Sequence, residues 1–209
     1  MKTFFLTLSF LAFGLQVMGQ SQAENYIKEA QTYLAAKDYK NAQMSLQDAI
    51  NDLNLMLGQQ IAESMPNEIN GLVASDEANN SGGMNIPGVG MTISKSYRHP
   101  SKKENDAEVQ ILANSPMLAA MNMYLNNPSM AGQGYKSIRV GTRRAILKSE
   151  MSDFYMDNGS SKQIRSTEIQ IPLSQTLITI NLRGFASEAE ELAFAGKLDI
   201  EKLRIALGE

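Results

Sequence analysis

The chain has 209 residues, and its 19 lysine and arginine residues against 22 aspartate and glutamate residues give a formal net charge of −3. This acidic balance, without a polybasic cluster, argues against nucleic acid as a partner. The chain contains no cysteine, which excludes thiolate chemistry, a disulfide framework and the acylated cysteine of a lipoprotein. Its length fits one domain with a small appendage.

Residues 1–19 have the order of a secretory signal peptide. Lys2 precedes an apolar run at residues 4–15, and polar residues follow from Gln20. Because that run is shorter than the roughly 20 residues that a membrane-spanning helix needs, we favour cleavage after Gly19 over retention as a membrane anchor. The sequence therefore predicts a periplasmic or secreted protein with no stable membrane anchor after cleavage.

Two helices are predicted within residues 20–65. Apolar residues recur at helical spacing on both sides of a polar break at Lys37 and Asp38. The first stripe consists of Ala23, Tyr26, Ile27, Ala30, Tyr33 and Leu34, and the second consists of Tyr39, Ala42, Leu46, Ala49, Leu53 and Leu57. A connection this short predicts an antiparallel helical hairpin.

This hairpin resembles a single tetratricopeptide repeat. The likeness rests on small and aromatic residues at the packing positions of that motif, namely Tyr26, Ala30, Tyr33, Ala42, Leu46 and Ala49. No second repeat follows, and such repeats normally need about three stacked units to bury a continuous core. We therefore expect the hairpin to pack against the rest of the chain, a second copy in a homo-oligomer, or another protein.

The pattern changes from helical to strand-like after a loop at residues 75–90, which is rich in Asp, Asn, Ser and Gly. Alternating apolar and polar residues predict strands at residues 91–97 and 108–113. Further strands are predicted at residues 137–140, 145–148, 168–173 and 177–182. A helix is predicted to begin at Ser115-Pro116 and to end at Asn126. Asp157-Asn158-Gly159 predicts a hairpin tip.

Helix returns at the C-terminus, where Ser187 is placed to cap residues 188–195 and a last amphipathic segment carries Ile200, Leu203 and Leu207. Strands that follow one another through short turns, with helices inserted and at the end, predict an α+β domain at residues 66–209. Its expected form is an antiparallel sheet covered by helices on one face.

Residues 106–130 and 144–148 carry a strand, a Ser-Pro-Met helix with further methionines, and an Asn-Pro end. This pattern resembles a family of uncharacterised exported bacterial proteins, and the likeness covers residues 66–206. The family usually has a tryptophan after the glycine that corresponds to Gly71, whereas this chain has Leu72. The resemblance implies export and a common fold, by analogy that of small α+β domains of the PsbP and Mog1 type, and it names no catalytic or binding residue.

Candidate chemistry is sparse, and we assign no catalytic, cofactor-binding or metal-binding residue. His99 is the only histidine, and it lies in a charged turn with no evident orienting carboxylate or nucleophile, which favours a surface histidine over a general base. A calcium loop built from Asp153, Asp157, Asn158 and Glu168 is disfavoured because their spacing does not match. Glu188, Glu190 and Glu191 are interpreted as carboxylates that favour the start of a helix.

The 13 methionines raise the alternative of a copper site, because thioethers suit Cu(I). We favour core packing for Met117 and Met121, together with Tyr124, on the face of their helix that meets the sheet. A soft-metal site would have to draw on methionines off that face or in loops, namely Met84, Met123, Met130, Met151 and Met156.

The leading hypothesis is a non-catalytic exported binding or assembly module that uses the hairpin for packing or protein contact. The alternative is a small-ligand or metal-binding envelope protein with a cleft between the sheet and the helix at residues 115–126, lined by Tyr97, Tyr124 and methionines. A third possibility is an enzyme that depends on His99.

Overall fold

A computed structural model describes residues 21–75, 91–127, 132, 134–157 and 159–209. The predicted signal peptide and nearly all of the predicted loop at residues 75–90 lie outside the described residues. The chain forms two compact units, Met1–Ala49 and Ile50–Glu209. This division falls inside a helix, whereas the sequence placed the boundary at residue 65.

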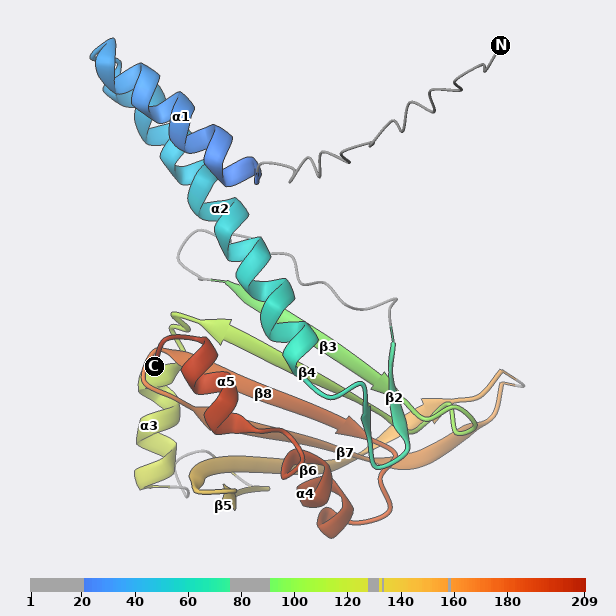
Figure 1. Ribbon diagram of the computed structural model, residues 1–209. Helices are drawn as coiled ribbons and strands as arrows, with labels where there is room; N and C mark the ends of the chain where they lie inside the picture. Colours follow the sequence, from blue (N-terminus) through green and yellow to red (C-terminus); the bar gives the residue numbers. More distant parts are fainter. Residues whose placement is uncertain (1–20, 76–90, 128–131, 133, 158) are drawn as a thin grey trace, which may run out of the picture. The chain divides into compact units, whose positions relative to one another are not determined.

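Both predicted N-terminal helices are present, as α1 (Gln22–Ala35) and α2 (Tyr39–Ser64) (Figure 1). The Ser21 hydroxyl accepts a hydrogen bond from the backbone N–H of Glu24 and so caps α1. Lys37 reverses the chain with a positive φ of 59°. Asp38 then accepts a hydrogen bond from the backbone N–H of Asn41 at 3.2 Å, which starts α2.

Among its described residues, the second unit contains one antiparallel sheet of eight strands, which confirms the predicted α+β class. The strands are β1 (Glu68–Ile69), β2 (Leu72–Ser75), β3 (Thr92–Arg98), β4 (Asp106–Ala113), β5 (Tyr135–Val140), β6 (Arg143–Tyr155), β7 (Ser161–Pro172) and β8 (Thr176–Arg183). Their order is β1-β2-β3-β4-β8-β7-β6-β5. The sheet therefore consists of two meanders, β1 to β4 and β5 to β8, joined only by the pairing of β4 with β8.

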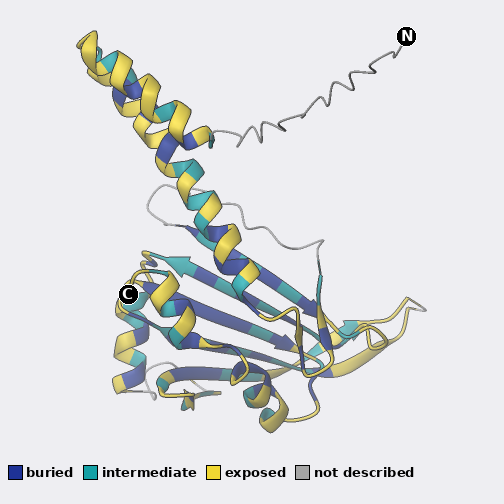
Figure 2. Cartoon of the chain, in the orientation of Figure 1, coloured by how far each residue is buried: buried dark blue, intermediate teal, exposed yellow. Residues whose placement is uncertain are grey.

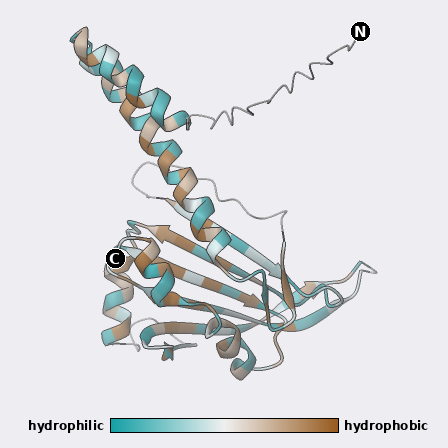
Figure 3. Cartoon of the chain, viewed as in Figure 1, coloured by the Kyte–Doolittle hydropathy of each residue, from teal (hydrophilic) through white to brown (hydrophobic). Residues whose placement is uncertain are grey.

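One face of the sheet carries the hydrophobic core. Alternate residues of the central strands point to it, and the register of β4 and β8 places Val109 opposite Ile180 and Ile111 opposite Ile178. These four side chains have no exposed surface. Figure 2 shows the resulting alternation of buried and less buried residues along the strands, and Figure 3 shows the apolar residues of the same strands.

Three helical segments cover this face: the end of α2, α4 (Glu188–Ala195) and α5 (Ile200–Ala206). Phe194 of α4 is fully buried, and its ring meets the rings of Tyr97 and Phe185 edge to face, at centroid distances of 5.5 and 5.9 Å. Ile200 and Leu203 of α5 join the same core. The predicted C-terminal helices and the Ser187 cap are confirmed.

The remaining helix, α3 (Leu118–Asn126), packs against β6 and β7. Its buried Met121 and Leu125 are not part of the core formed with the other helices. The Arg144 side chain, which alternation directs to the opposite face from the core residue Ala145, donates a hydrogen bond to the backbone oxygen of Leu125. Thus α3 covers the end of the other face of the sheet.

The end of α2 is fastened to the sheet by a buried lysine. Lys95 on β3 is 3% exposed, and its ammonium donates hydrogen bonds to the backbone oxygens of Ala62 and Met65, each at 2.9 Å, and to Asn67 Oδ1 at 3.1 Å. The last carbonyls of a helix lack partners within the helix and carry partial negative charge. The ammonium satisfies these oxygens, so the last turn of α2 belongs to the structure of the sheet unit.

Candidate functional site

The seam between the two helices of the hairpin is made of small side chains. Ala23 and Ala30 of α1 and Ala42 and Ala49 of α2 are each at most 3% exposed. Ser45, also buried, donates a hydrogen bond to Glu29 across the seam at 3.3 Å. Small residues let the helices approach closely, but they leave little apolar surface to bury, so the larger side chains of the hairpin lie elsewhere.

Those larger side chains follow the buried alanines at a fixed interval. Ile27, Leu34 and Leu46 come four residues after Ala23, Ala30 and Ala42, and they are 39%, 48% and 43% exposed. Four residues turn a helix about 40° beyond one full turn, so each lies just beside the seam. In two antiparallel helices that face each other, rotation in the same sense leads to the same side of the hairpin.

We call this side the outer face and define it by Ile27, Gln31, Leu34, Tyr39, Gln43 and Leu46. Tyr39 is the most exposed of its large apolar residues, at 67%. None of the six side chains carries a charge. Isolated exposed apolar residues are common on proteins, whereas a contiguous group of them marks an interaction site. The outer face is therefore the strongest candidate functional surface in the described chain.

The sequence predicted one apolar stripe on each helix, whereas the structure divides each stripe in two. In α2, Ala42 and Ala49 point into the seam, while Tyr39 and Leu46 are exposed beside it. A large apolar residue four positions after each buried alanine was visible in the sequence, namely Ile27, Leu34, Leu46 and Leu53. On each helix the apolar stripe is wider than contact with one neighbouring helix requires. This width is the sequence feature that could have predicted the exposed outer face.

The single histidine has a local structural role. His99 follows β3, and its Nδ1 accepts hydrogen bonds from the backbone N–H groups of Ser101 and Lys102 at 3.1 and 3.2 Å. It thereby shapes the turn between β3 and β4. No carboxylate hydrogen bond to this ring is present among the described residues, and the histidine is not brought together with the other candidate residues.

The three candidate calcium ligands that the structure describes do not converge either. Asp157 pairs with Lys103 at 2.5 Å, and this hydrogen bond lowers the pKa of the Asp157 carboxyl. Asp153 accepts a hydrogen bond from Gln163, and Glu168 accepts one from Gln170. Asn158 lies outside the described residues. Within the described part of the chain, no group of three or more His, Asp or Glu side chains is arranged as a metal site.

The methionines are also dispersed. Met121 is 4% exposed, as expected for core packing, but Met117 is 47% exposed because α3 begins only at Leu118. Met123, Met151 and Met156 are exposed on α3 and around the β6–β7 hairpin. Met84 and Met130 lie outside the described residues. The structure therefore brings together no methionine cluster among those it describes.

The cleft considered for a small ligand does not form from the residues named for it. Tyr97 is fully buried in the core, which includes no residue of α3, and its hydroxyl donates a hydrogen bond to the backbone oxygen of Pro66 at 2.9 Å. Burial raises the pKa of Tyr97 to about 12. Tyr124 is part of α3, on the other face of the sheet. The two tyrosines thus serve different packing regions.

The sequence analysis did not predict an ionic cluster around one buried carboxylate. Glu191 has no exposed surface, and its Oε1 accepts hydrogen bonds from Arg165 Nε and Thr167 Oγ1, both at 2.7 Å. Glu188 pairs with Arg165 at 3.6 Å and with Lys136. These contacts bind α4 to β5 and β7. Arg165 and Thr167 lie on the same face of β7 as the core residue Ile169. Two polar residues at positions that alternation assigns to the core were the sequence feature that could have indicated this cluster.

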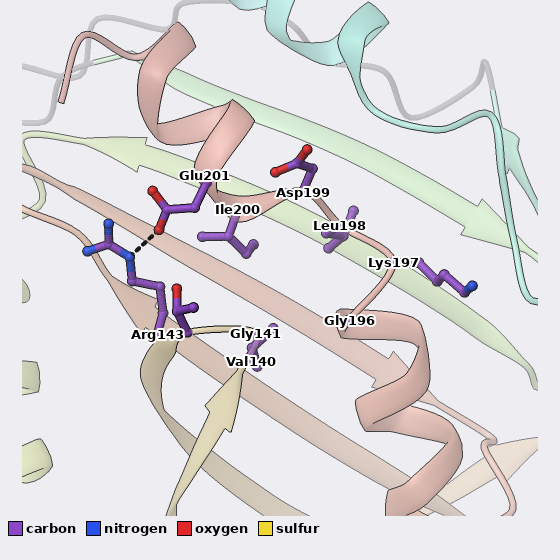
Figure 4. Close-up of a pocket in the computed structure, with 10 residues that line it drawn as sticks. Val140, Gly141, Arg143, Gly196, Lys197, Leu198, Asp199, Ile200 and Glu201 are labelled. Atoms are coloured by element: carbon purple, nitrogen blue, oxygen red, sulfur yellow. Dashed lines mark hydrogen bonds and ion pairs between the residues drawn. The ribbon is translucent and has the colours of Figure 1, made fainter.

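The sheet unit also has an open hollow of about 400 Å³ between the β5–β6 turn and the α4–α5 connection (Figure 4). Here Arg143 Nε donates to Glu201 Oε1 at 2.6 Å, and Arg204 Nε donates to Glu201 Oε2 at 2.8 Å. These hydrogen bonds lower the pKa of Glu201 to about 2. Figure 4 shows Lys197 pointing away from this pair. The Glu201 carboxylate at the hollow is therefore already paired with two guanidinium groups.

No protein-family model and no curated protein matches the chain. A crystal structure of a protein from Bacteroides thetaiotaomicron VPI-5482 is similar over 51% of this chain and 38% of that chain, with 11% sequence identity and a TM-score of 0.39. The chain thus spans less than half the length of that protein, and a likeness this distant carries no functional assignment. Among the described residues, no helix has both the length and the apolarity to cross a membrane.

Proposed function

We propose that this protein is a non-catalytic exported module for binding or assembly, and that its helical hairpin makes the protein contact. The outer face is the observation that supports this proposal. Its four large apolar residues are 39% to 67% exposed while the adjacent alanines are buried. Burying such residues against a partner removes apolar surface from water, which favours association.

The side chains considered for chemistry have structural partners among the described residues. His99 accepts hydrogen bonds from its own turn, and Glu191 holds α4 against β7. Both roles are structural, which agrees with a binding module. Export rests on the predicted signal peptide at residues 1–19 and belongs to the same proposal.

Point substitution is the appropriate test. A chain without residues 20–66 would lose Ile61, Ala62 and Met65 from the sheet core and two of the three acceptors of the Lys95 ammonium. Leu46→Asp instead places a charge in the middle of the outer face. Met44→Asp is a matched control, because Met44 is 57% exposed on the same helix but lies about 200° around the axis from Ala42.

The experiment is chemical crosslinking in exporting cells, followed by capture of the protein and mass spectrometry. We expect a crosslinked product, with another protein or with a second copy of the chain, that forms with the wild type and with Met44→Asp and is lost with Leu46→Asp. Circular dichroism of both variants checks that the helices remain. If Leu46→Asp and Met44→Asp capture the same proteins as the wild type, the outer face is not the contact and the proposal fails.

A further inference from the structure

The spacing of the outer face indicates the kind of partner. Ile27, Gln31 and Leu34 in α1 are separated by four and then three residues. Tyr39, Gln43 and Leu46 in α2 repeat these intervals, and the same alternation continues along α2 to Ile50 and Leu53, each 50% exposed. Alternating intervals of four and three are the pattern by which a helix presents a straight seam to another helix.

Each helix of the hairpin therefore has two adjacent seams. In α1 the inner seam includes Ala23 and Ala30, and in α2 it includes Ala42 and Ala49. The outer face supplies the second seam of each helix. A helix in a four-helix bundle contacts two neighbours and needs an apolar face of this greater width. Within the described part of the chain, the hairpin itself provides one neighbour for each of its helices and leaves the place of the second open.

We infer that the outer face binds the outer face of a second copy of this chain, so that two hairpins form a four-helix bundle. This inference rests on the proposed function and names its partner. A second hairpin supplies the missing neighbour of both helices at once. Symmetric dimers are the commonest soluble oligomers, and they require a surface that is complementary to itself.

The composition of the outer face satisfies that requirement. Its six residues carry no charge, so two copies can meet along them without opposing like charges. The carboxylate that continues the same spacing, Glu24, lies beyond them in the first turn of α1. Gln31 and Gln43 are its only amide side chains, and both are exposed. Within an interface, an amide can donate to and accept from the same group of another copy. A single polar level in an apolar helical seam also favours one register over others.

The test is the molar mass of the purified chain in solution, measured by light scattering after size-exclusion chromatography at several concentrations. We expect the wild type to have twice the mass of one chain at the higher concentrations. Leu46→Asp and, on the other helix, Ile27→Asp are expected to reduce the mass to that of one chain. Met44→Asp is expected to leave the dimer intact, because its side chain is outside the outer face.

The possible outcomes separate this inference from the proposed function. A wild type that is monomeric at every concentration overturns the inference, and the proposed function survives if crosslinking still captures a different protein through Leu46. A dimer that persists in both Leu46→Asp and Ile27→Asp, with helicity retained, also overturns it, because the dimer then uses another surface. If the wild type is monomeric and neither substitution changes what is captured, both statements fail.

Discussion

The helical hairpin buries alanine and serine between its helices, whereas the sheet unit buries isoleucine, leucine and aromatic side chains. Ala30 and Ala49 represent the first kind of interior, and Ile111, Ile178 and Phe194 represent the second. Buried apolar area stabilises a fold by roughly 25 cal/mol per Å². The sheet unit therefore obtains most of its stability from its own core, while the hairpin leaves Ile27, Leu34, Tyr39 and Leu46 exposed to water.

This difference teaches where to look for function. A region that buries its large apolar side chains within itself is stable without a partner, and substitutions on its surface have little effect. The hairpin has not buried its apolar residues within the described chain, so its outer face stands out although it contains no reactive group. Four substitutions test this comparison, and each is expected to affect one region more than the other.

The largest effect is expected for Phe194→Ala, which should destabilise the sheet unit by about 4 kcal/mol. Phe194 is fully buried between Tyr97 and Phe185, and its loss leaves a cavity and removes two edge-to-face ring contacts. Urea unfolding followed by tyrosine fluorescence measures the change in the free energy of unfolding. Phe154→Ala on the partly exposed part of β6 is the control, and equal losses for the two variants would contradict a core centred on α4.

Lys95→Met should destabilise the sheet unit by about 3 kcal/mol. The methionine has a similar length, but it leaves the backbone oxygens of Ala62 and Met65 buried without their donor. Hydrogen exchange should show faster opening of the last turn of α2, measured beside urea unfolding. Lys162→Met removes an exposed lysine and is the control. A loss no larger than that of the control would mean that water replaces the ammonium without cost.

Ala30→Leu should destabilise the hairpin by about 2 kcal/mol, because the larger side chain does not fit the seam. Ala30 is 1% exposed. The hairpin and the sheet unit thus respond to opposite changes. A larger side chain destabilises the seam of the hairpin, whereas a smaller side chain destabilises the core of the sheet unit. Hydrogen exchange should accelerate in α1 and stay unchanged in β4 and β8. The exposed Ala35→Leu serves as the control, and slower exchange in α1 of Ala30→Leu would show that the seam contains unfilled space.

Tyr97→Phe should cost about 1 kcal/mol at neutral pH through loss of the hydrogen bond to Pro66. Because burial raises the pKa of Tyr97 from 10.0 to about 12, the fold favours the neutral phenol. The contribution of the neutral Tyr97 side chain to the free energy of unfolding is complete below about pH 10 and is lost as pH rises toward 12. The melting temperature of the wild type should therefore fall more steeply between pH 9 and 12 than that of Tyr97→Phe. Tyr155→Phe, at an exposed tyrosine, is the control.

Periodicity in the sequence was sufficient for the class of fold and for most elements. The helices at residues 188–195 and after Asp38 were placed correctly because their caps and apolar stripes agree. The β1–β2 hairpin was not predicted as a pair of strands, since β1 has only two residues and its turn depends on the positive φ of Asn70 and Gly71. The length of β6 was underestimated because its outer half is exposed and lacks apolar alternation.

The candidate site was only half predictable. The hairpin was recognised, but the separation of inner seam from outer face depends on which side chains the partner helix covers, and that is a tertiary property. Lys95 could not be distinguished from a surface lysine in the pattern of β3, because its acceptors lie at the end of α2, about 30 residues away in sequence. Glu191 was assigned to the helix dipole, whereas its main partners come from β7.

The strand order has a consequence for how fast the sheet can form. Within each meander, neighbouring strands are also neighbours in sequence, so their pairing closes short loops. The pairing of β4 with β8 joins residues such as Asp106 and Arg183, which are 77 positions apart. Contacts between distant segments slow folding, because loop closure costs entropy before the contact is gained. We expect the two meanders to assemble early and the β4–β8 ladder to set the folding rate.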